Sequence, residues 1–240
     1  MGKRVVAVFM TLMLIASTGF VVAAEWADEA AIVRGGRLYD KWYEELDIEA
    51  PTVANPAYPA SATHANDPKA NWRCKECHGW DYKGRDGRYG SGKRATGIKG
   101  IQGMAGASPD TIVTILKDNN HAYTDKLSAK DRQDLALFVS RGQFDMDAVI
   151  DSGSGKPKSG DPTRGAVYYH TVCAQCHGDQ GTKIKKMPPM GKVASENPWE
   201  TLHKILNGEP GEGMPPLRAF TQIGAHLDIL SYIQTLPKEK

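Results

Sequence analysis

The chain has 240 residues, of which 24% are charged and 40% are hydrophobic. This charged fraction is ordinary for a soluble protein, which excludes wholesale disorder and a membrane protein with many spans. Thirty basic residues against 28 acidic residues give a formal net charge of +2. That balance is too even for a general nucleic-acid binder, so we expect no nucleic-acid partner. The length allows one or two domains.

The N-terminus has the pattern of an export signal. Two basic residues precede an apolar run at 5–22, which ends in small side chains. This predicts a signal peptide over 1–24, cleaved after Ala24, although the run could also serve as an uncleaved anchor. Cleavage would leave 28 basic and 28 acidic residues, and no later stretch is apolar enough to span a bilayer. We therefore expect a periplasmic or otherwise exported protein with no stable membrane span after cleavage.

All four cysteines belong to two copies of one motif. The copies are Cys74-Lys-Glu-Cys77-His78 and Cys173-Ala-Gln-Cys176-His177. C-x-x-C-H is the attachment signature of c-type haem, in which two thiols on one helical turn bond the haem vinyl groups and the histidine ligates the iron. A disulfide within either pair would constrain little of the unfolded chain. For a single motif, a zinc site or a thioredoxin-like dithiol is the alternative. Two copies in an exported chain predict two covalently attached haems, with His78 and His177 on iron.

The segments around the second motif follow a recognisable order. They are Gly165 to Tyr169 before the motif, Met187-Pro188-Pro189-Met190 after it, then 198–208, Met214-Pro215-Pro216, and a closing segment at 226–236. In this order the second half resembles the class I cytochrome c family. The resemblance implies that Met214 is the sixth ligand of the second haem, with Met187 and Met190 as rivals. It also implies that the carbonyl of Pro188 or Pro189 holds the N–H of the proximal histidine.

The first half repeats parts of the second. Gly35-Gly36-Arg-Leu-Tyr39 matches Arg164-Gly165-Ala-Val-Tyr168, 108–117 matches 197–206, and 134–139 matches 228–233. Both closing segments have apolar residues at helical spacing, and no strand pattern appears. We therefore predict a mostly α fold with two cytochrome c-type haem domains in tandem. The predicted parts are a first domain at 25–150, a Gly/Ser/Pro linker at 151–162 and a second domain at 163–240.

The first half contains an insertion before its motif. Thirty-four residues separate Tyr39 from Cys74, whereas four separate Tyr168 from Cys173. Four prolines in the inserted stretch, about 43–71, predict a loop rather than a helix. We favour a flap over one haem edge; a docking surface and a source of a ligand are the alternatives.

The first half also lacks a Met-Pro at the ligand position. Counted back from the closing helix, His121 falls near the place that Met214 occupies in the second half, so we predict that His121 is the sixth ligand of the first haem. Met104, His64 and an open iron site are the alternatives. Imidazole favours ferric iron relative to a thioether, so the first haem should have the lower potential and pass electrons to the second. We interpret His170, His203 and His226 as structural or solvent-exposed.

These features predict an exported di-haem protein that relays electrons from a redox donor protein to an acceptor protein. A cytochrome subunit of a larger oxidoreductase complex and a di-haem enzyme of the peroxidase or thiosulfate dehydrogenase type stay open as alternatives. We expect a carrier rather than an enzyme, and an oligomer is possible. Lys183, Lys185 and Lys186 form a candidate docking patch, for which a solvated charge run is the alternative reading.

Overall fold

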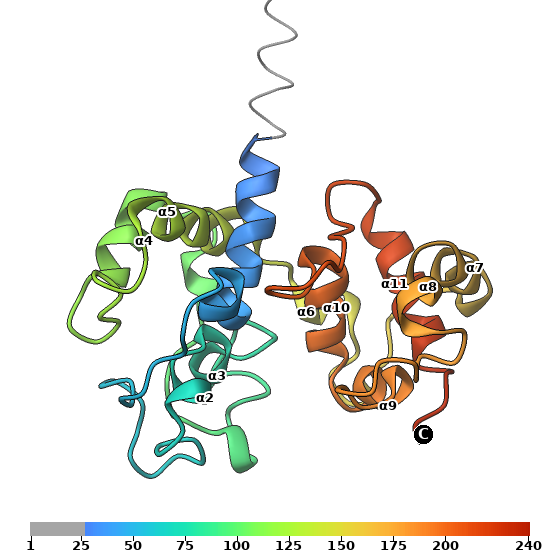
Figure 1. Ribbon diagram of the computed structural model, residues 1–240, viewed down its shortest axis with the longest axis horizontal. Helices are drawn as coiled ribbons and strands as arrows, with labels where there is room; N and C mark the ends of the chain where they lie inside the picture. The colour runs from blue at the N-terminus through green and yellow to red at the C-terminus, as the bar shows by residue number, and fades with distance from the viewer. Residues whose placement is uncertain (1–26) are drawn as a thin grey trace, which may run out of the picture.

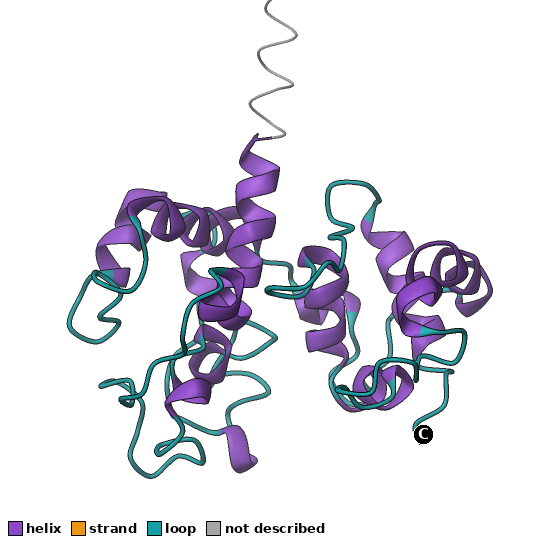
Figure 2. Cartoon of the chain, in the orientation of Figure 1, coloured by secondary structure: helices purple, strands orange, loops and turns teal. Residues whose placement is uncertain are grey.

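A computed structural model describes residues 27–240 of the chain (Figure 1). The predicted signal peptide lies outside the described residues. The described part is helical and has no strand, only isolated bridges of Gly84 with Lys99 and of Ile150 with Pro157 (Figure 2). The predicted mostly α class is therefore confirmed for this part. Within 27–240, no helix has the length and apolar character needed to cross a bilayer.

The first described element is a helical stretch at 27–45, drawn in blue in Figure 1. The α-helices that follow are α2 (Pro68–Asn71), α3 (Cys74–His78), α4 (Pro109–Leu116), α5 (Ala129–Leu137), α6 (Met146–Val149), α7 (Pro162–Tyr168), α8 (Ala174–His177), α9 (Met190–Glu196), α10 (Pro198–Asn207) and α11 (Ile223–Ile233). Short 3-10 turns lie at Gly92–Arg94 and Gln102–Met104, and π-helical turns at Phe138–Gly142 and Tyr169–Cys173. Proline in the first turn of α4, α7 and α10 supplies a preset φ at a position that needs no N–H donor.

In the first half, the helix at 27–45 crosses α5 at a glycine. A Cβ at Gly35 would overlap the carbonyl oxygen of Asp134, so the two backbones can approach only because this residue is glycine. The neighbouring Arg34 donates to the Asp134 carboxylate at 2.7 Å. Ile32, Leu38 and Phe138 are buried around this crossing.

The second half builds the same crossing between α7 and α11. A Cβ at Gly165 would overlap the carbonyl oxygen of Asp228, and Arg164 Nε lies 2.8 Å from the Asp228 carboxylate. Arg34, Gly35 and Asp134 thus correspond to Arg164, Gly165 and Asp228.

This correspondence corrects the repeat register by one residue. Tyr39 donates its hydroxyl to the carbonyl of Gly79 at 2.6 Å, and Tyr169 donates to the carbonyl of Gly178 at 2.7 Å. Each acceptor directly follows a C-x-x-C-H motif. Tyr39 therefore corresponds to the buried Tyr169, whereas the sequence comparison had paired it with Tyr168, which is 38% exposed.

The two halves meet where the helix at 27–45 packs against α10. A Cβ at Gly36 would overlap the Asn207 side chain, so glycine allows this approach. His203 Nε2 donates to the Gly36 carbonyl at 2.9 Å. Lys204 Nζ lies 2.8 Å from the buried carboxylate of Asp40. In Figure 1, α10 is the helix of the second half that faces the first half.

Hydrogen bonds hold both the insertion and the linker against the rest of the chain. The helix continues to residue 45 and α2 occupies 68–71, so the insertion is irregular only over 46–67, a narrower loop than predicted. The backbone N–H of Asn55, in this loop, donates to the side-chain oxygen of Asn71 at 2.9 Å. In the linker, Gly155 accepts a hydrogen bond from the Gln234 side chain of the second half at 2.8 Å.

Candidate haem sites

The first motif opens onto a cavity of about 430 Å³. Its lining includes Cys74, Cys77, His78 and His121. Most of the remaining wall is apolar, supplied by Ile101, Met104, Ile112, Ile115, Leu116, Leu135 and Val139. Asn55 and Ala57 of the insertion also line it. A cofactor-sized cavity with apolar walls and a few converging polar groups fits a covalently held haem.

The histidine of the first motif is oriented by a backbone carbonyl. His78 Nδ1 donates to the carbonyl of Lys99 at 2.7 Å, which leaves Nε2 with its lone pair. Burial lowers the pKa of His78 to about 4, against a smaller upward effect of this hydrogen bond. A neutral imidazole with an outward lone pair is the form that ligates a metal. The sequence offered no signal for Lys99, because a carbonyl contact does not depend on the side chain.

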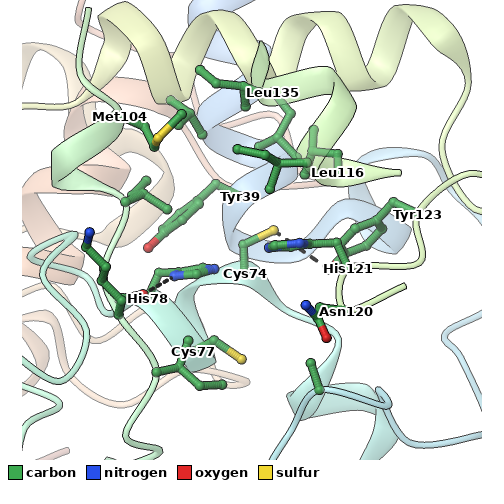
Figure 3. A pocket seen from close by; sticks show the side chains of 18 of the residues that line it. Tyr39, Cys74, Cys77, His78, Met104, Leu116, Asn120, His121, Tyr123 and Leu135 are labelled. Carbon is green, nitrogen blue, oxygen red and sulfur yellow. Dashed lines mark hydrogen bonds between the residues drawn. The ribbon is translucent and has the colours of Figure 1, made fainter. Parts of the chain in front are cut away.

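His121 faces His78 across the cavity. The two imidazole ring centroids are 6.2 Å apart, and the ring planes differ by 13° (Figure 3). This separation is too long for direct stacking. Two imidazoles on opposite sides of one metal atom would have centroids about 6 Å apart, since each metal–nitrogen bond is about 2 Å and each nitrogen lies about 1 Å from its ring centre. The spacing therefore fits an iron atom between the rings.

A carboxylate holds His121 on its outer side. Asp118 Oδ1 accepts a hydrogen bond from His121 Nδ1 at 3.0 Å and another from the His121 backbone N–H at 2.8 Å. Burial on its own would raise the pKa of Asp118, but the hydrogen bonds from His121 lower it overall. We did not predict a role for Asp118 from the sequence. The one signal for it is its place three positions before the candidate ligand His121.

The other candidate ligands of the first half occupy different places. Met104 lines the same cavity (Figure 3). His64 does not line it: its Nδ1 lies 3.9 Å from Asp67 and its Nε2 lies 4.0 Å from Glu76. The structure thus separates His64 from the motif histidine and leaves His121 and Met104 as the candidates within reach.

The thiols of the first motif are not activated. Burial raises the pKa of Cys74 to about 11 and that of Cys77 to about 12. Cysteines of thioredoxin-like dithiols have lowered pKa values because the thiolate is the reacting form. These two thiols therefore do not fit a redox-active dithiol, and all four cysteines of the chain are free of disulfides.

The second motif lies nearer the surface. Cys176 is exposed, and Cys173 and His177 are half-buried. Burial lowers the pKa of His177 and raises that of Cys173 to about 11. His177 Nδ1 is buried and has no hydrogen-bond partner within the described residues. The set of two thiols and an imidazole on one helical turn fits c-type haem in the same way as the first motif.

Met214 is half-buried in the loop between α10 and α11. The loop turns at Gly208, whose φ is +86°, and a Cβ there would lie 2.7 Å from the Met214 carbonyl oxygen. The backbone N–H of Leu217 then donates to the carbonyl of Ile205 at 3.0 Å, which ties the loop to α10.

One expectation from the resemblance is not met near the second motif, and one rival ligand has another contact. His177 Nδ1 has no hydrogen-bond partner within the described residues, so neither the Pro188 nor the Pro189 carbonyl holds it. The Pro189 carbonyl accepts the N–H groups of Lys192 at 3.0 Å and Val193 at 3.1 Å, at the start of α9. The rival ligand Met190 is buried, and its sulfur lies 3.7 Å from the Tyr169 hydroxyl. Met190 therefore has a packing role, while Met187 is half-buried against the core.

The remaining histidines differ in burial. His203 and His226 are buried, and His170 is exposed, with its Nε2 3.0 Å from the Tyr232 hydroxyl. All three fit the expectation of a structural or solvent-exposed histidine: His170 is exposed, and His203 and His226 are buried and hydrogen-bonded. His203 lies at the contact between the halves.

One comparison with known proteins finds a match. Residues 160–226 match the family model described as cytochrome C oxidase, cbb3-type, subunit III. No curated protein matches the chain, and neither does any solved structure. The matched segment contains the second motif, α7 to α10 and Met214. The match supports a c-type cytochrome domain in this part of the chain, and such a domain implies a covalently bound haem iron and electron transfer with redox partners.

Proposed function

We propose that the chain is an exported di-haem cytochrome c that relays electrons between a donor and an acceptor protein. The observation that carries this proposal is the repeated geometry of the two halves. The first half has the same glycine crossing, arginine–aspartate pair and tyrosine–carbonyl hydrogen bond as the second half, which contains the segment that matches the family model. These contacts support a second cytochrome c domain in the part of the chain that the family model does not cover.

In the first domain, Cys74 and Cys77 would attach the haem, and His78 and His121 would ligate its iron. The ring spacing of 6.2 Å supports this pair over His78 with Met104. The hydrogen bond to the Lys99 carbonyl fixes the orientation of His78. Apolar side chains line most of this cavity, and the insertion at 46–67 contributes Asn55 and Ala57 to its wall.

In the second domain, Cys173 and Cys176 would attach the haem, with His177 and Met214 as axial ligands. The bound haems supply one-electron redox chemistry, and the chain sets their ligands, burial and separation. A thioether ligand favours ferrous iron more than an imidazole does, so the second site has the higher potential. Electrons would therefore move from the first site to the second.

The export proposal rests on the sequence at 1–24, which has the pattern of a signal peptide.

The proposal of two haems rests on the cysteines. Covalent attachment of two haems uses all four cysteines, so no thiol is left over for another role.

A count of haems and one spectrum test the proposal. We expect two haems per chain by pyridine haemochrome assay, and two haem additions to the mass of the mature chain. The dithionite-reduced protein should show the same optical spectrum before and after carbon monoxide, because both irons have two protein ligands. One haem per chain would refute the proposal that both halves are haem domains. A carbon monoxide adduct would refute the full ligand sets and favour a di-haem enzyme with an open iron.

The family match favours a second candidate, a cytochrome subunit of a larger complex, since the matched description names an oxidase subunit. The haem chemistry would be the same, but the partner would be permanent. Purification of the tagged chain from its native cells, solubilised in mild detergent, distinguishes the two. Stoichiometric recovery of other subunits supports the complex, and recovery of the chain alone supports a free carrier.

A further inference from the structure

The loop that carries His121 is organised around a single oxygen atom. Oδ1 of Asp118 accepts the backbone N–H groups of Asn120 at 2.9 Å and His121 at 2.8 Å, and also His121 Nδ1 at 3.0 Å. A carboxylate is only an acceptor, so His121 Nδ1 carries the proton and Nε2 carries the lone pair. The carboxylate thus selects the tautomer in which Nε2 can bind a metal.

The loop is also fixed at its far end. Ala122 has a φ of +53°, a strained conformation for a residue with a side chain. The backbone N–H of Tyr123 donates to the Leu116 carbonyl at 3.1 Å, and its buried hydroxyl donates to the Trp72 carbonyl at 2.7 Å. The loop therefore spans from the end of α4 to the first motif, with His121 between two anchors.

The two imidazoles that face each other across the cavity have unlike outer partners. His78 donates to a neutral carbonyl, that of Lys99, whereas His121 donates to a carboxylate. A carboxylate partner makes an imidazole ligand more basic, and its negative charge favours the more positive state of the metal.

We propose that Asp118 is the positioning residue of the sixth ligand of the first haem. It holds His121 in its binding tautomer and orientation, and its charge lowers the reduction potential of the first haem below the value that two imidazoles alone would give. This inference rests on the proposed function, because it requires His121 to bind iron.

Two substitutions of Asp118 separate its charge from its anchoring. Asp118→Asn keeps an oxygen at the Oδ1 position but removes the charge. In the full-length holoprotein, we expect the ferrous-to-ferric ratio of the first haem at a fixed potential to rise about five- to tenfold, which is about 40–60 mV in a redox titration. The second haem should keep its potential, and reduced protein should form no carbon monoxide adduct. Asp118→Ala removes the anchor as well, so carbon monoxide should then bind the first haem.

Asp125→Asn is the matched control. Asp125 is an exposed residue of the same loop, and its carboxylate makes no hydrogen bond or ion pair within residues 27–240. Its substitution removes the same charge without touching His121, so the ratio should change less than twofold. An equal shift in Asp118→Asn and Asp125→Asn, or an Asp118→Ala protein with wild-type potential and no adduct, would overturn the inference. An unchanged spectrum of the second haem shows that each variant has folded.

His121→Ala distinguishes this failure from failure of the ligand assignment. If the reduced His121→Ala protein forms no carbon monoxide adduct, His121 is not the ligand and both proposals about it fall. If it forms the adduct while the Asp118 variants behave like wild type, only the role of Asp118 is refuted.

Discussion

Tyr39 and Tyr169 each donate to the carbonyl that directly follows a C-x-x-C-H motif. Both carbonyls belong to a glycine with positive φ, +79° at Gly79 and +77° at Gly178. In each case the hydroxyl fixes the residue after the motif histidine, so the orientation of that histidine depends on a tyrosine that precedes the motif in the chain. This contact explains why a tyrosine recurs in both halves. It also explains why the equivalent of Tyr39 is Tyr169 and not its neighbour Tyr168.

Substitution of these tyrosines tests the one-residue correction of the repeat. Tyr169→Phe should lower the free energy of unfolding by about 1–3 kcal/mol, because the Gly178 carbonyl loses its buried donor. Tyr168→Phe should leave it unchanged, because the Tyr168 hydroxyl makes no hydrogen bond within the described residues. Urea unfolding measures both. A larger loss of unfolding free energy in Tyr168→Phe than in Tyr169→Phe would instead support the pairing of Tyr39 with Tyr168.

At the scale of the helices, each half depends on the close crossing of an early helix and a closing helix. In the second half, α7 and α11 meet at Gly165, whose missing side chain leaves room for the Asp228 carbonyl. A methyl group has no space there, so the helices would have to separate and expose part of the core.

We therefore expect Gly165→Ala to lower the free energy of unfolding by about 1–3 kcal/mol, the usual range for overpacking. Gly224→Ala is the control, because Gly224 is also helical, in α11, and a Cβ there would meet no atom within 4 Å. That change should be neutral or stabilise the helix by about 0.5–1 kcal/mol. Thermal unfolding of both variants checks the contrast; equal effects would contradict the crossing.

The elements themselves could be predicted well from the sequence. The repeated segments at 108–117 and 197–206 contain α4 and all of α10 except its last residue, because a proline in the first turn and apolar residues at helical spacing mark both. The closing helix α11 begins three residues before the predicted start at His226. The register of Tyr168 and Tyr169 could not be predicted, since adjacent tyrosines differ only in burial.

The candidate site could be predicted only in part, for a similar reason. Motif residues and His121 are chemically distinctive, so pattern and position single them out. The Lys99 carbonyl and the Asp118 carboxylate act through backbone geometry and loop closure, which depend on how the chain folds around the cavity.

Over the whole molecule, His203 is the buried link between the halves. Its Nε2 donates to the Gly36 carbonyl, and its Nδ1 accepts the Tyr82 hydroxyl at 2.8 Å. Burial lowers the pKa of His203 to about 4, outweighing the upward effects of Asp40 and of the Gly36 hydrogen bond, and Lys204 and Arg218 lower it further. The neutral ring is therefore the form that joins the halves.

This shift predicts a pH dependence. The folded pKa of about 4 lies below the ordinary value of about 6.5, so the unfolded chain binds more protons between these two values. The contribution of His203 is complete above about pH 6.5 and is lost as the pH falls toward 4, by up to ~3 kcal/mol. His203→Gln should flatten the pH profile of unfolding in this window relative to wild type. Parallel profiles would show that His203 does not titrate on unfolding. Comparison with the variant is needed because burial also lowers the pKa of His177 and His226.

The glycine at position 36 has a consequence for attempts to divide the chain. A cut within 151–162 would leave one fragment with a notch at Gly36 and the other with the exposed side of α10 that fills it, including Asn207 and His203. The two surfaces have complementary shapes, so separately produced fragments should associate into a one-to-one complex. Analytical ultracentrifugation would measure this association. A fragment carrying Gly36→Leu would have no notch and should stay alone. The linker would then mainly raise the effective concentration of two halves that can associate without it.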